Sequence, residues 1–231
     1  MIGASSENRG DLLAGLAAGT EVLGLSLSEA QQQNLMAYLD LIQKWNKVYN
    51  LTALRDPKDM LTHHLLDSLS AVGPLQRHLQ GVLSFDEQAC TLLDVGSGGG
   101  LPGVVLAICC PSIRVTCVDA VSKKAAFVQQ VAASLKLPNL KGVHARVESL
   151  AGPFDVVCSR AFASLPDFVN WSSGALADAG VWMAMKGKLP TEEMLALPSF
   201  AQVFHVEHLQ VPGLDAERCM IWMKKSPSSS S

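Results

Sequence analysis

This sequence of 231 residues has little charge, no basic excess and no long apolar run. Charged residues make up 17% of it, and the formal net charge is −3. A dedicated nucleic-acid-binding protein usually carries a strong basic excess, so the composition excludes a large nonspecific electrostatic surface and leaves room only for a local basic patch. Because a transmembrane helix needs roughly 18 consecutive apolar residues, we expect no membrane association and a cytoplasmic protein.

The sequence also has no closely spaced cysteine pair of the CxxC type, and we expect no leader segment. No CxxC spacing occurs among the six cysteines, and Cys90, Cys117 and Cys158 lie in or beside apolar, strand-like runs. We therefore expect buried, reduced thiols and no metal site. The apolar stretch that starts at Leu12 is short and has no lysine-rich start, so we expect no signal peptide.

The apolar fraction of 48% allows a sizeable core. Before residue 81 the pattern predicts two helices. Ser28 and Gln31 have the spacing of a capping box, and apolar residues recur at helical spacing up to Tyr49. The second helix is expected to begin at Asp56 and Pro57. It is expected to end at Gly73 and Pro74, after the stripe formed by Leu61, Leu65, Leu69 and Val72.

After residue 81 strands alternate with helices, which predicts an α/β fold with a mostly parallel sheet. The expected strands are 91–95, 113–119, 142–146, 154–159 and 180–186, and the expected helices are 102–109, 122–136 and 167–178. Two further β-like runs, 201–211 and 217–224, fit a C-terminal antiparallel hairpin. We therefore expect an N-terminal helical extension over 1–80, a main domain over 81–225 and a disordered tail over 226–231.

The strongest motif is the glycine-rich stretch DVGSGGGLPG over 94–103, which joins the first strand to a helix. Such a turn lets a ligand approach the main chain at the end of a parallel sheet. The glycine spacing is GxGxG, which resembles the S-adenosylmethionine loop of class I (Rossmann-like) methyltransferases. We expect Gly96, Ser97 and Gly98 to bind this cofactor, and Gly96 to be required because a side chain would occupy the ligand's space.

Three later residues extend the expected cofactor site. Asp119 ends the second strand, where its carboxylate can accept hydrogen bonds from both ribose hydroxyls of an adenosyl group. Val147 and Glu148 directly follow the third expected strand, at the place where an adenine edge lies in a class I site. Alone, each signal is weak; their order after the glycine turn favours one adenosyl site.

Several longer pieces resemble one family, the bacterial small-subunit ribosomal RNA guanine-N7 methyltransferases (RsmG, or GidB). They are WNKVYNLT (45–52), HHLLDSL (63–69), LLDVGSGGGLPG (92–103), VDAVSKKAAFVQQV (118–131), HARVESL (144–150), SRAFASL (159–165) and AMKG (184–187). The resemblance implies an S-adenosylmethionine site at Gly96, Leu101, Val147, Glu148 and Arg160. It also implies methylation of 16S ribosomal RNA, or of the small ribosomal subunit, by a protein that we expect to be a monomer. The one departure noted is glycine at position 99, where the family is expected to have alanine or proline.

The sequence offers fewer candidate residues for substrate binding and catalysis than for cofactor binding. Guanine N7 has an exposed lone pair and needs no deprotonation, and no catalytic base motif follows the fourth strand. Arg160, after that strand, could bind a phosphate, guanine O6 or the cofactor carboxylate, and is the best candidate for a catalytic role. Arg146 and Lys186 are weaker candidates for RNA contacts. His64, Asp67 and Ser68 share one helix face, and we expect a polar network there that docks the helices onto the sheet.

Two other functions remain open at this point. A small-molecule methyltransferase would share the cofactor site and use the N-terminal helices as a lid. A nonenzymatic adenosyl- or nicotinamide-binding module would share only the turn, and Leu101 speaks against nicotinamide because a dinucleotide fingerprint needs glycine there.

Overall fold

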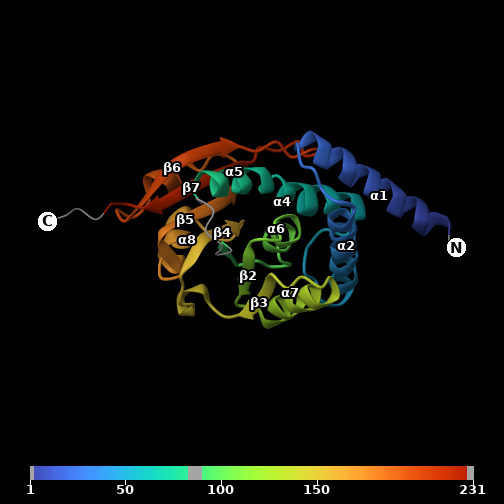
Figure 1. Cartoon of the computed structure of the whole chain (residues 1–231), viewed down its shortest axis with the longest axis horizontal. Helices are drawn as coiled ribbons and strands as arrows, with labels where there is room; N and C mark the ends of the chain where they lie inside the picture. Colours follow the sequence, from blue (N-terminus) through green and yellow to red (C-terminus); the bar gives the residue numbers. More distant parts are fainter. Residues whose placement is uncertain (1–2, 83–89, 228–231) are drawn as a thin grey trace.

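The computed structural model describes residues 3–82 and 90–227 and contains one seven-stranded sheet (Figure 1). The strand order is β3-β2-β1-β4-β5-β7-β6, with β1 to β5 parallel and β7 antiparallel to both of its neighbours. This confirms the predicted class I methyltransferase sheet with a C-terminal hairpin. The strands are β1 (Thr91–Val95), β2 (Arg114–Asp119), β3 (Leu140–His144), β4 (Phe154–Arg160), β5 (Leu176–Lys186), β6 (Ala201–His208) and β7 (Cys219–Lys225).

Successive side chains of each strand enter different halves of the core, because a strand points them to opposite faces. Leu92 packs with the N-terminal helices, α6 and α7, whereas Leu93 packs with α8 on the other face. The N-terminal helices are α1 (Gly3–Val22), α2 (Glu29–Tyr49), α3 (Pro57–Met60), the π-helix η1 (Leu61–Leu66), α4 (Asp67–Leu69) and α5 (Val72–Val82). The others are α6 (Gly103–Cys109), α7 (Ser122–Ser134), the 3-10 turn η2 (Val147–Ser149), α8 (Leu165–Ser172) and α9 (Thr191–Leu195).

The chain order reverses at β1, which lies between β2 and β4. From β1 the chain moves outward to β2 and β3, then returns to β4 on the other side. In open parallel sheets the crevice beyond the carboxyl ends of the strands at such a reversal is where ligands bind. The glycine turn begins at this point, immediately after Val95.

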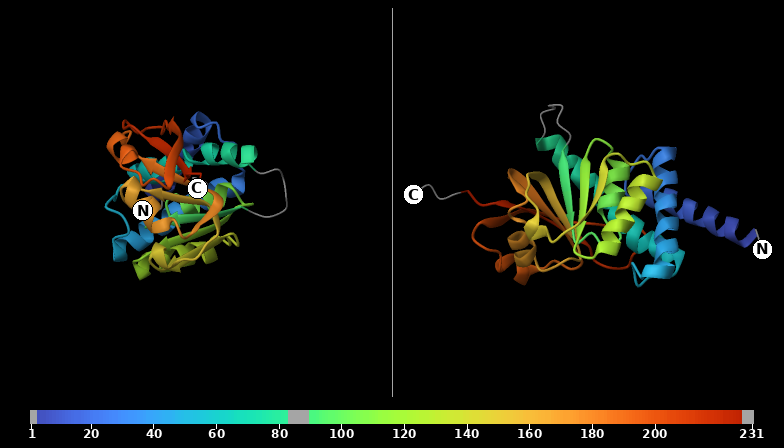
Figure 2. Two further views of the ribbon diagram at one scale, coloured as in Figure 1. Left: turned by 90° about the vertical axis from the view of Figure 1, so that its left-hand side faces the viewer. Right: turned by 90° about the horizontal axis from the view of Figure 1, so that it is seen from below.

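Helix α1 was not expected from the sequence, because glycine disfavours helix interiors. Two of its glycines instead allow close packing on η1. A Cβ at Gly15 would lie 2.9 Å from Leu61, and one at Gly19 would lie 2.4 Å from Leu66. The N-terminal half of α1 projects from the body of the molecule (Figures 1 and 2).

The next helix, α2, confirms the expectation and adds a contact. Gln31 closes the capping box through its Oε1, which accepts from the Ser28 backbone N–H at 2.9 Å. Its Nε2 donates to the carbonyls of Ile108 and Cys109, both at 3.1 Å. One side chain therefore caps the start of α2 and the end of α6, which fixes the helical segment to the main sheet.

Two predicted helix ends were wrong, and the third strand spans Leu140–His144 instead of the expected 142–146. Gly73 and Pro74 do not end a helix; they lie in the first turn of α5, where proline is tolerated because its missing N–H would have no helical partner. The helix expected over 167–178 ends at Ser172, and β5 already begins at Leu176. Pairing of Leu176 with Phe154 of β4 overrides the local helix preference of that stretch.

The six cysteines are buried and free, as predicted. Burial raises the pKa of the Cys158 thiol well above its usual range, so this side chain stays protonated and packs as a neutral residue of the core. Within the described residues, no helix has both the length and the apolar character needed to cross a bilayer. Residues 228–231, most of the tail expected to be disordered, lie outside the described residues.

Candidate active site

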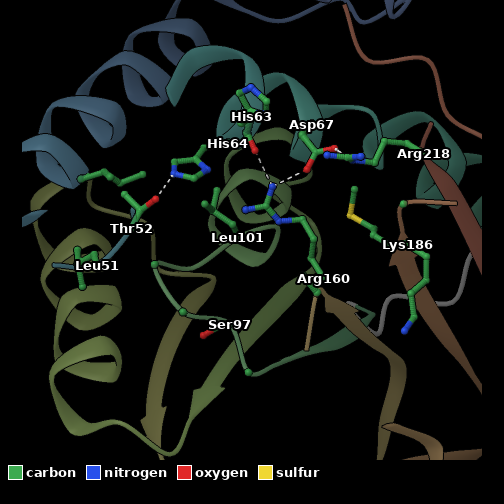
Figure 3. Close-up of a pocket in the computed structure, with 17 residues that line it drawn as sticks. Leu51, Thr52, His63, His64, Asp67, Ser97, Leu101, Arg160, Lys186 and Arg218 are labelled. Carbon is green, nitrogen blue, oxygen red and sulfur yellow. Dashed lines mark hydrogen bonds and ion pairs between the residues drawn. The ribbon is translucent and has the colours of Figure 1, made fainter. Parts of the chain in front are cut away.

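Two cavities open at the carboxyl ends of the central strands, and both are lined by Gly96. The large cavity, about 490 Å³, lies between the glycine turn and the N-terminal helices (Figure 3). Its lining is Ile42, Leu51, Thr52, His63, His64, Asp67, Gly96, Ser97, Gly98, Gly99, Leu101, Arg160, Ala161, Met185, Lys186, Gly187 and Arg218. The small cavity, about 210 Å³, is lined by Val95, Gly96, Val118, Asp119, Ala120, Ala145, Arg146, Val147, Glu148, Phe162 and Trp171.

The three glycines of the GxGxG pattern share one backbone property. Gly96, Gly98 and Gly100 have φ of 63°, 59° and 87°, in the left-handed region that side chains disfavour. The turn closes on itself as the N–H groups of Gly100 and Leu101 donate to the Ser97 carbonyl, at 2.8 and 3.0 Å. The glycines of the GxGxG pattern therefore stand at the three positions of this turn where the backbone adopts a left-handed conformation.

The glycines differ in what surrounds them. A Cβ at Gly99 would meet nothing within 4 Å, and one at Gly98 would meet only a backbone oxygen at 4.0 Å. The main chain of the turn is thus exposed toward the large cavity. At Gly96 the structure gives a different reason for glycine from the expected one, because a Cβ there would lie 2.0 Å from the ring of Phe162.

Asp119 holds the glycine turn as well as lining the small cavity. Its Oδ2 accepts from the Gly98 N–H at 3.0 Å, its Oδ1 accepts from the Val121 N–H at 2.8 Å, and the Lys124 ammonium lies 3.8 Å from Oδ2. Each carboxylate oxygen can accept more than one hydrogen bond, so both keep capacity for a ligand. Val147, which is buried, and Glu148, which is exposed, lie in the same cavity.

Arg160 lies at the centre of the large cavity and is held from the helical side. Its Nη1 donates to the His63 carbonyl at 2.9 Å and to Asp67 Oδ2 at 2.6 Å. The other oxygen of Asp67 accepts from Arg218 Nε at 2.9 Å (Figure 3). One buried carboxylate from α4 therefore joins guanidinium groups that come from the end of β4 and the start of β7. Such charge-assisted bonds are among the strongest in proteins.

Sequence reasoning missed Arg218, although a signal for it exists. β7 runs antiparallel to β5, with Cys219 opposite Lys186. The residue that precedes an antiparallel strand thus lies at the same sheet edge as the carboxyl ends of the parallel strands. A charged side chain just before the last strand is therefore a candidate for the site.

The polar network expected on the second helix is confirmed only for Asp67. His64 hydrogen-bonds through Nε2 with Thr52 Oγ1 at 2.9 Å, so it stays within the helical segment. Burial, with the nearby Arg160 guanidinium as a second cause, lowers the pKa of His64 to about 4. Its ring is therefore neutral at physiological pH. The ring of His63 points away from Arg160 (Figure 3).

Lys186 and Arg146, the two residues predicted to contact RNA, line different cavities. The Lys186 ammonium donates to the Ala163 carbonyl at 2.7 Å and to Glu193 Oε2 at 2.8 Å, so it is already paired. Arg146 is exposed and lies at the small cavity, beside the expected adenosyl site, so it is not part of the large cavity. RNA contacts by these two residues stay predictions.

Tyr38 of α2 connects the helical segment to the glycine turn. Its hydroxyl donates to the Gly99 carbonyl at 2.5 Å. The side chain is fully buried, and burial raises the pKa of the phenol well above its usual value. The hydroxyl therefore stays a donor, and the N-terminal helices take part in shaping the turn.

Comparison with known proteins gives a consistent result. A family model for GidB, rRNA small subunit methyltransferase G, matches residues 31–221. Ribosomal RNA small subunit methyltransferase G of Paracidovorax citrulli is 66% identical over 218 residues, which cover 92% of this chain and 90% of the relative. The protein of the same name from a Polaromonas species is 65% identical, covering 90% and 92%.

The solved structures support the fold. Coclaurine N-methyltransferase, bound to N-methylheliamine and SAH, superposes with a TM-score of 0.57 over 95% of each chain at 10% identity. At this identity the likeness shows the fold and says nothing about the substrate.

Proposed function

This chain belongs to the rRNA small subunit methyltransferase G (GidB) family, and we propose that it methylates N7 of a guanosine in 16S ribosomal RNA. It is an S-adenosylmethionine-dependent methyltransferase with a class I sheet. The observation that carries the finer proposal is the large cavity, which offers cationic and neutral polar groups to a substrate. Among the described residues that line it, the one carboxylate, Asp67, is already bound to two arginines.

The residues present fit the cofactor across both cavities. In the small cavity Asp119 keeps lone pairs for ribose hydroxyls, and Val147 and Glu148 would line the adenine. At the junction the open main chain of Gly98 would lie against the ligand, and Arg160 would face its carboxylate. When bound, S-adenosylmethionine supplies an activated methyl group on a sulfonium.

The protein then has to align the accepting RNA base with the methyl group. Such alignment can supply much of the reduction in the activation barrier when two reactants combine. The Asp67 carboxylate is committed to two guanidinium groups, and Nε2 of His64 is engaged with Thr52. Neither is arranged to remove a proton. Guanine N7 needs none removed, and its neighbour O6 can accept a single hydrogen bond from an arginine that leaves the N7 lone pair free.

The large cavity carries two arginines against one carboxylate with His64 neutral, which favours an anionic substrate such as RNA over a neutral metabolite. High identity over nine tenths of the chain to relatives named for small-subunit ribosomal RNA supports the same choice. We further infer that residues 1–80 form a helical extension of the catalytic domain 81–225, and that the protein is a cytoplasmic monomer acting on RNA or on the assembled subunit.

A single-turnover transfer assay with labelled cofactor tests this proposal. Small-subunit RNA and assembled small subunits from cells lacking the protein should accept one methyl group per RNA, whereas large-subunit RNA and a panel of metabolites should accept none. Transfer to a metabolite with no transfer to either form of the small subunit would overturn the proposal in favour of a small-molecule methyltransferase.

A further inference from the structure

The small cavity contains an aromatic pair to which no role has been assigned above. Phe162 and Trp171 line this cavity together with Val118 and Val147, and the pair is called the aromatic wall below. Phe162 follows β4, and Trp171 lies near the end of α8. Much of the lining is therefore apolar, and it also includes the carboxylate of Asp119.

The position of Phe162 is set by the glycine turn itself. A Cβ at Gly96 would lie within 3 Å of three atoms of the Phe162 ring. Trp171 meets this ring edge-on, with centroids 5.8 Å apart and an interplanar angle of 77°. This is the edge-to-face arrangement that aromatic pairs favour, so the pair forms a defined surface.

Trp171 is poorly explained as a core residue. On α8 the buried positions are Leu165, Phe168, Val169 and Ser172, whereas Trp171 is 41% exposed. A tryptophan so exposed at the mouth of a cavity leaves a large apolar surface in water. A flat ligand that enters the cavity would cover it.

We propose that Phe162 and Trp171 form an aromatic wall of the adenine subsite, and that Trp171 covers the purine as a cofactor-binding residue. The inference rests on the proposed use of an adenosyl cofactor and adds the two aromatic residues that would contact its adenine base. A purine fits the wall because it has two apolar faces, and Asp119 lies where the attached ribose would follow. Stacking of a base on an aromatic side chain stabilises its binding, because every base has an apolar face.

An RNA base is the competing occupant of this wall. The cavity is small, shares Gly96 with the large cavity and contains Asp119, all of which suit a ligand that continues along the glycine turn. An RNA chain would instead be expected to follow exposed basic residues, and of these only Arg146 lines the small cavity. Adenine is therefore the better match.

The experiment measures binding of S-adenosylhomocysteine, adenosine and homocysteine by calorimetry and by tryptophan fluorescence. The variants are Trp171→Ala and Trp171→Phe, with Phe204→Ala as a control because Phe204 is equally exposed, at 42%, and lies away in the hairpin. Trp171→Ala should weaken S-adenosylhomocysteine about 5- to 30-fold, and Phe204→Ala should not change it. Circular dichroism confirms the fold of each variant.

Fluorescence and kinetics provide independent readouts. Adenosine should change the emission of the parent protein and homocysteine should not, and the adenosine response should disappear in Trp171→Phe while binding persists. In steady state, Trp171→Ala should raise KM for the cofactor and leave kcat nearly unchanged, because it removes uniform binding.

The outcomes separate this inference from the proposed function. If the parent binds no S-adenosylhomocysteine, both fail. If the parent binds it and Trp171→Ala binds equally well, the adenine wall is wrong while the methyltransferase proposal stands. Unchanged cofactor affinity together with weaker binding of small-subunit RNA would overturn the inference and assign the wall to an RNA base.

Discussion

The small and large cavities meet at Gly96 but are assembled from the chain in different ways. Most of the small cavity comes from consecutive strand ends between Val95 and Glu148, and two aromatics complete it. The large cavity draws on residues from Ile42 to Arg218, in helices and strands far apart in sequence. The first is a local product of strand–turn–helix units, and the second exists only once the whole chain has folded.

The two cavities also depend on different stabilising interactions. The small cavity depends on backbone conformation at the glycine turn and on its amide contacts with Asp119. The large cavity depends on charges brought together by tertiary structure, with Asp67 at their centre. Variants should therefore affect the two regions differently: changes at the glycine turn should alter cofactor binding, and changes at Asp67 should alter the stability of the fold.

Removing the Asp67 carboxylate should do the most damage. Asp67→Ala leaves the largely buried guanidinium groups of Arg160 and Arg218 without their partner, and breaking a buried ion pair this way typically costs 3–5 kcal/mol. Because both arginines keep some exposure, 17% and 24%, we expect the free energy of unfolding to fall by about 3–4 kcal/mol. Urea unfolding followed by circular dichroism measures it.

The control for Asp67→Ala is Asp67→Asn, which keeps one acceptor oxygen and should be intermediate. A free energy of unfolding within about 0.5 kcal/mol of the parent for Asp67→Ala, the range of ordinary surface substitutions, would show that the charge bridge does not hold the large cavity together.

The second prediction compares two glycines of one turn. Gly96→Ala forces a side chain into a left-handed conformation, which costs about 1–2 kcal/mol, and displaces Phe162. We expect a loss of about 2–3 kcal/mol in unfolding free energy and weaker cofactor binding. Gly99→Ala meets open space at an ordinary φ and should stay within about 0.5 kcal/mol of the parent. Equal losses at both positions would contradict the description of the turn.

The third prediction concerns Asp119 and the ribose. Asp119→Ala should weaken S-adenosylhomocysteine by about 1.5–3 kcal/mol, the range for hydrogen bonds to a charged group. Part of that loss comes from releasing Gly98, so a 2′-deoxy analogue separates the two roles. The analogue should bind less tightly than S-adenosylhomocysteine to the parent and lose less in the variant. Calorimetric losses that are the same in both proteins would remove Asp119 from the ribose site.

The smallest effect is expected from pH. The pKa of His64 is lowered to about 4, so this ring is neutral above that pH and does not change charge between pH 6.5 and 8.5. The single-turnover rate with saturating RNA and cofactor should be nearly flat over that window, in which a catalytic base would titrate. Arg160→Lys should slow transfer without adding an ionisation, since it keeps the charge and loses the planar fork. A steep log-linear rise would point to a base and to another target atom.

The fold could be predicted from the sequence wherever local signals were strong. Buried strands such as Thr91–Val95, and the capped helix at Ser28, carry their own patterns. Helix α1 was missed because its glycines serve a contact with η1 that only the tertiary structure reveals. The end of α8 was misjudged because pairing with β4 draws Leu176 into a strand.

The residues of the candidate site could likewise be predicted from the sequence only where a local pattern marked them. Gly96, Asp119 and Val147 could be located because each ends or directly follows a predicted strand, although their ligand contacts stay predictions. Arg218 was missed although its place just before an antiparallel last strand made it a candidate. Tyr38 could not be located, because its role depends on a contact with a turn far away in sequence. The reason for glycine at position 96 was also hidden, since Phe162 lies 66 residues later in the chain.

The most direct test of the account is to identify the methylated atom. Small-subunit RNA from cells lacking the protein is treated with it and S-adenosylmethionine, digested to nucleosides and analysed by mass spectrometry against authentic standards. The account predicts a single new product, 7-methylguanosine, in small-subunit RNA. A methyl group on an exocyclic amine, a pyrimidine carbon or a ribose hydroxyl, or no product in small-subunit RNA at all, would contradict it.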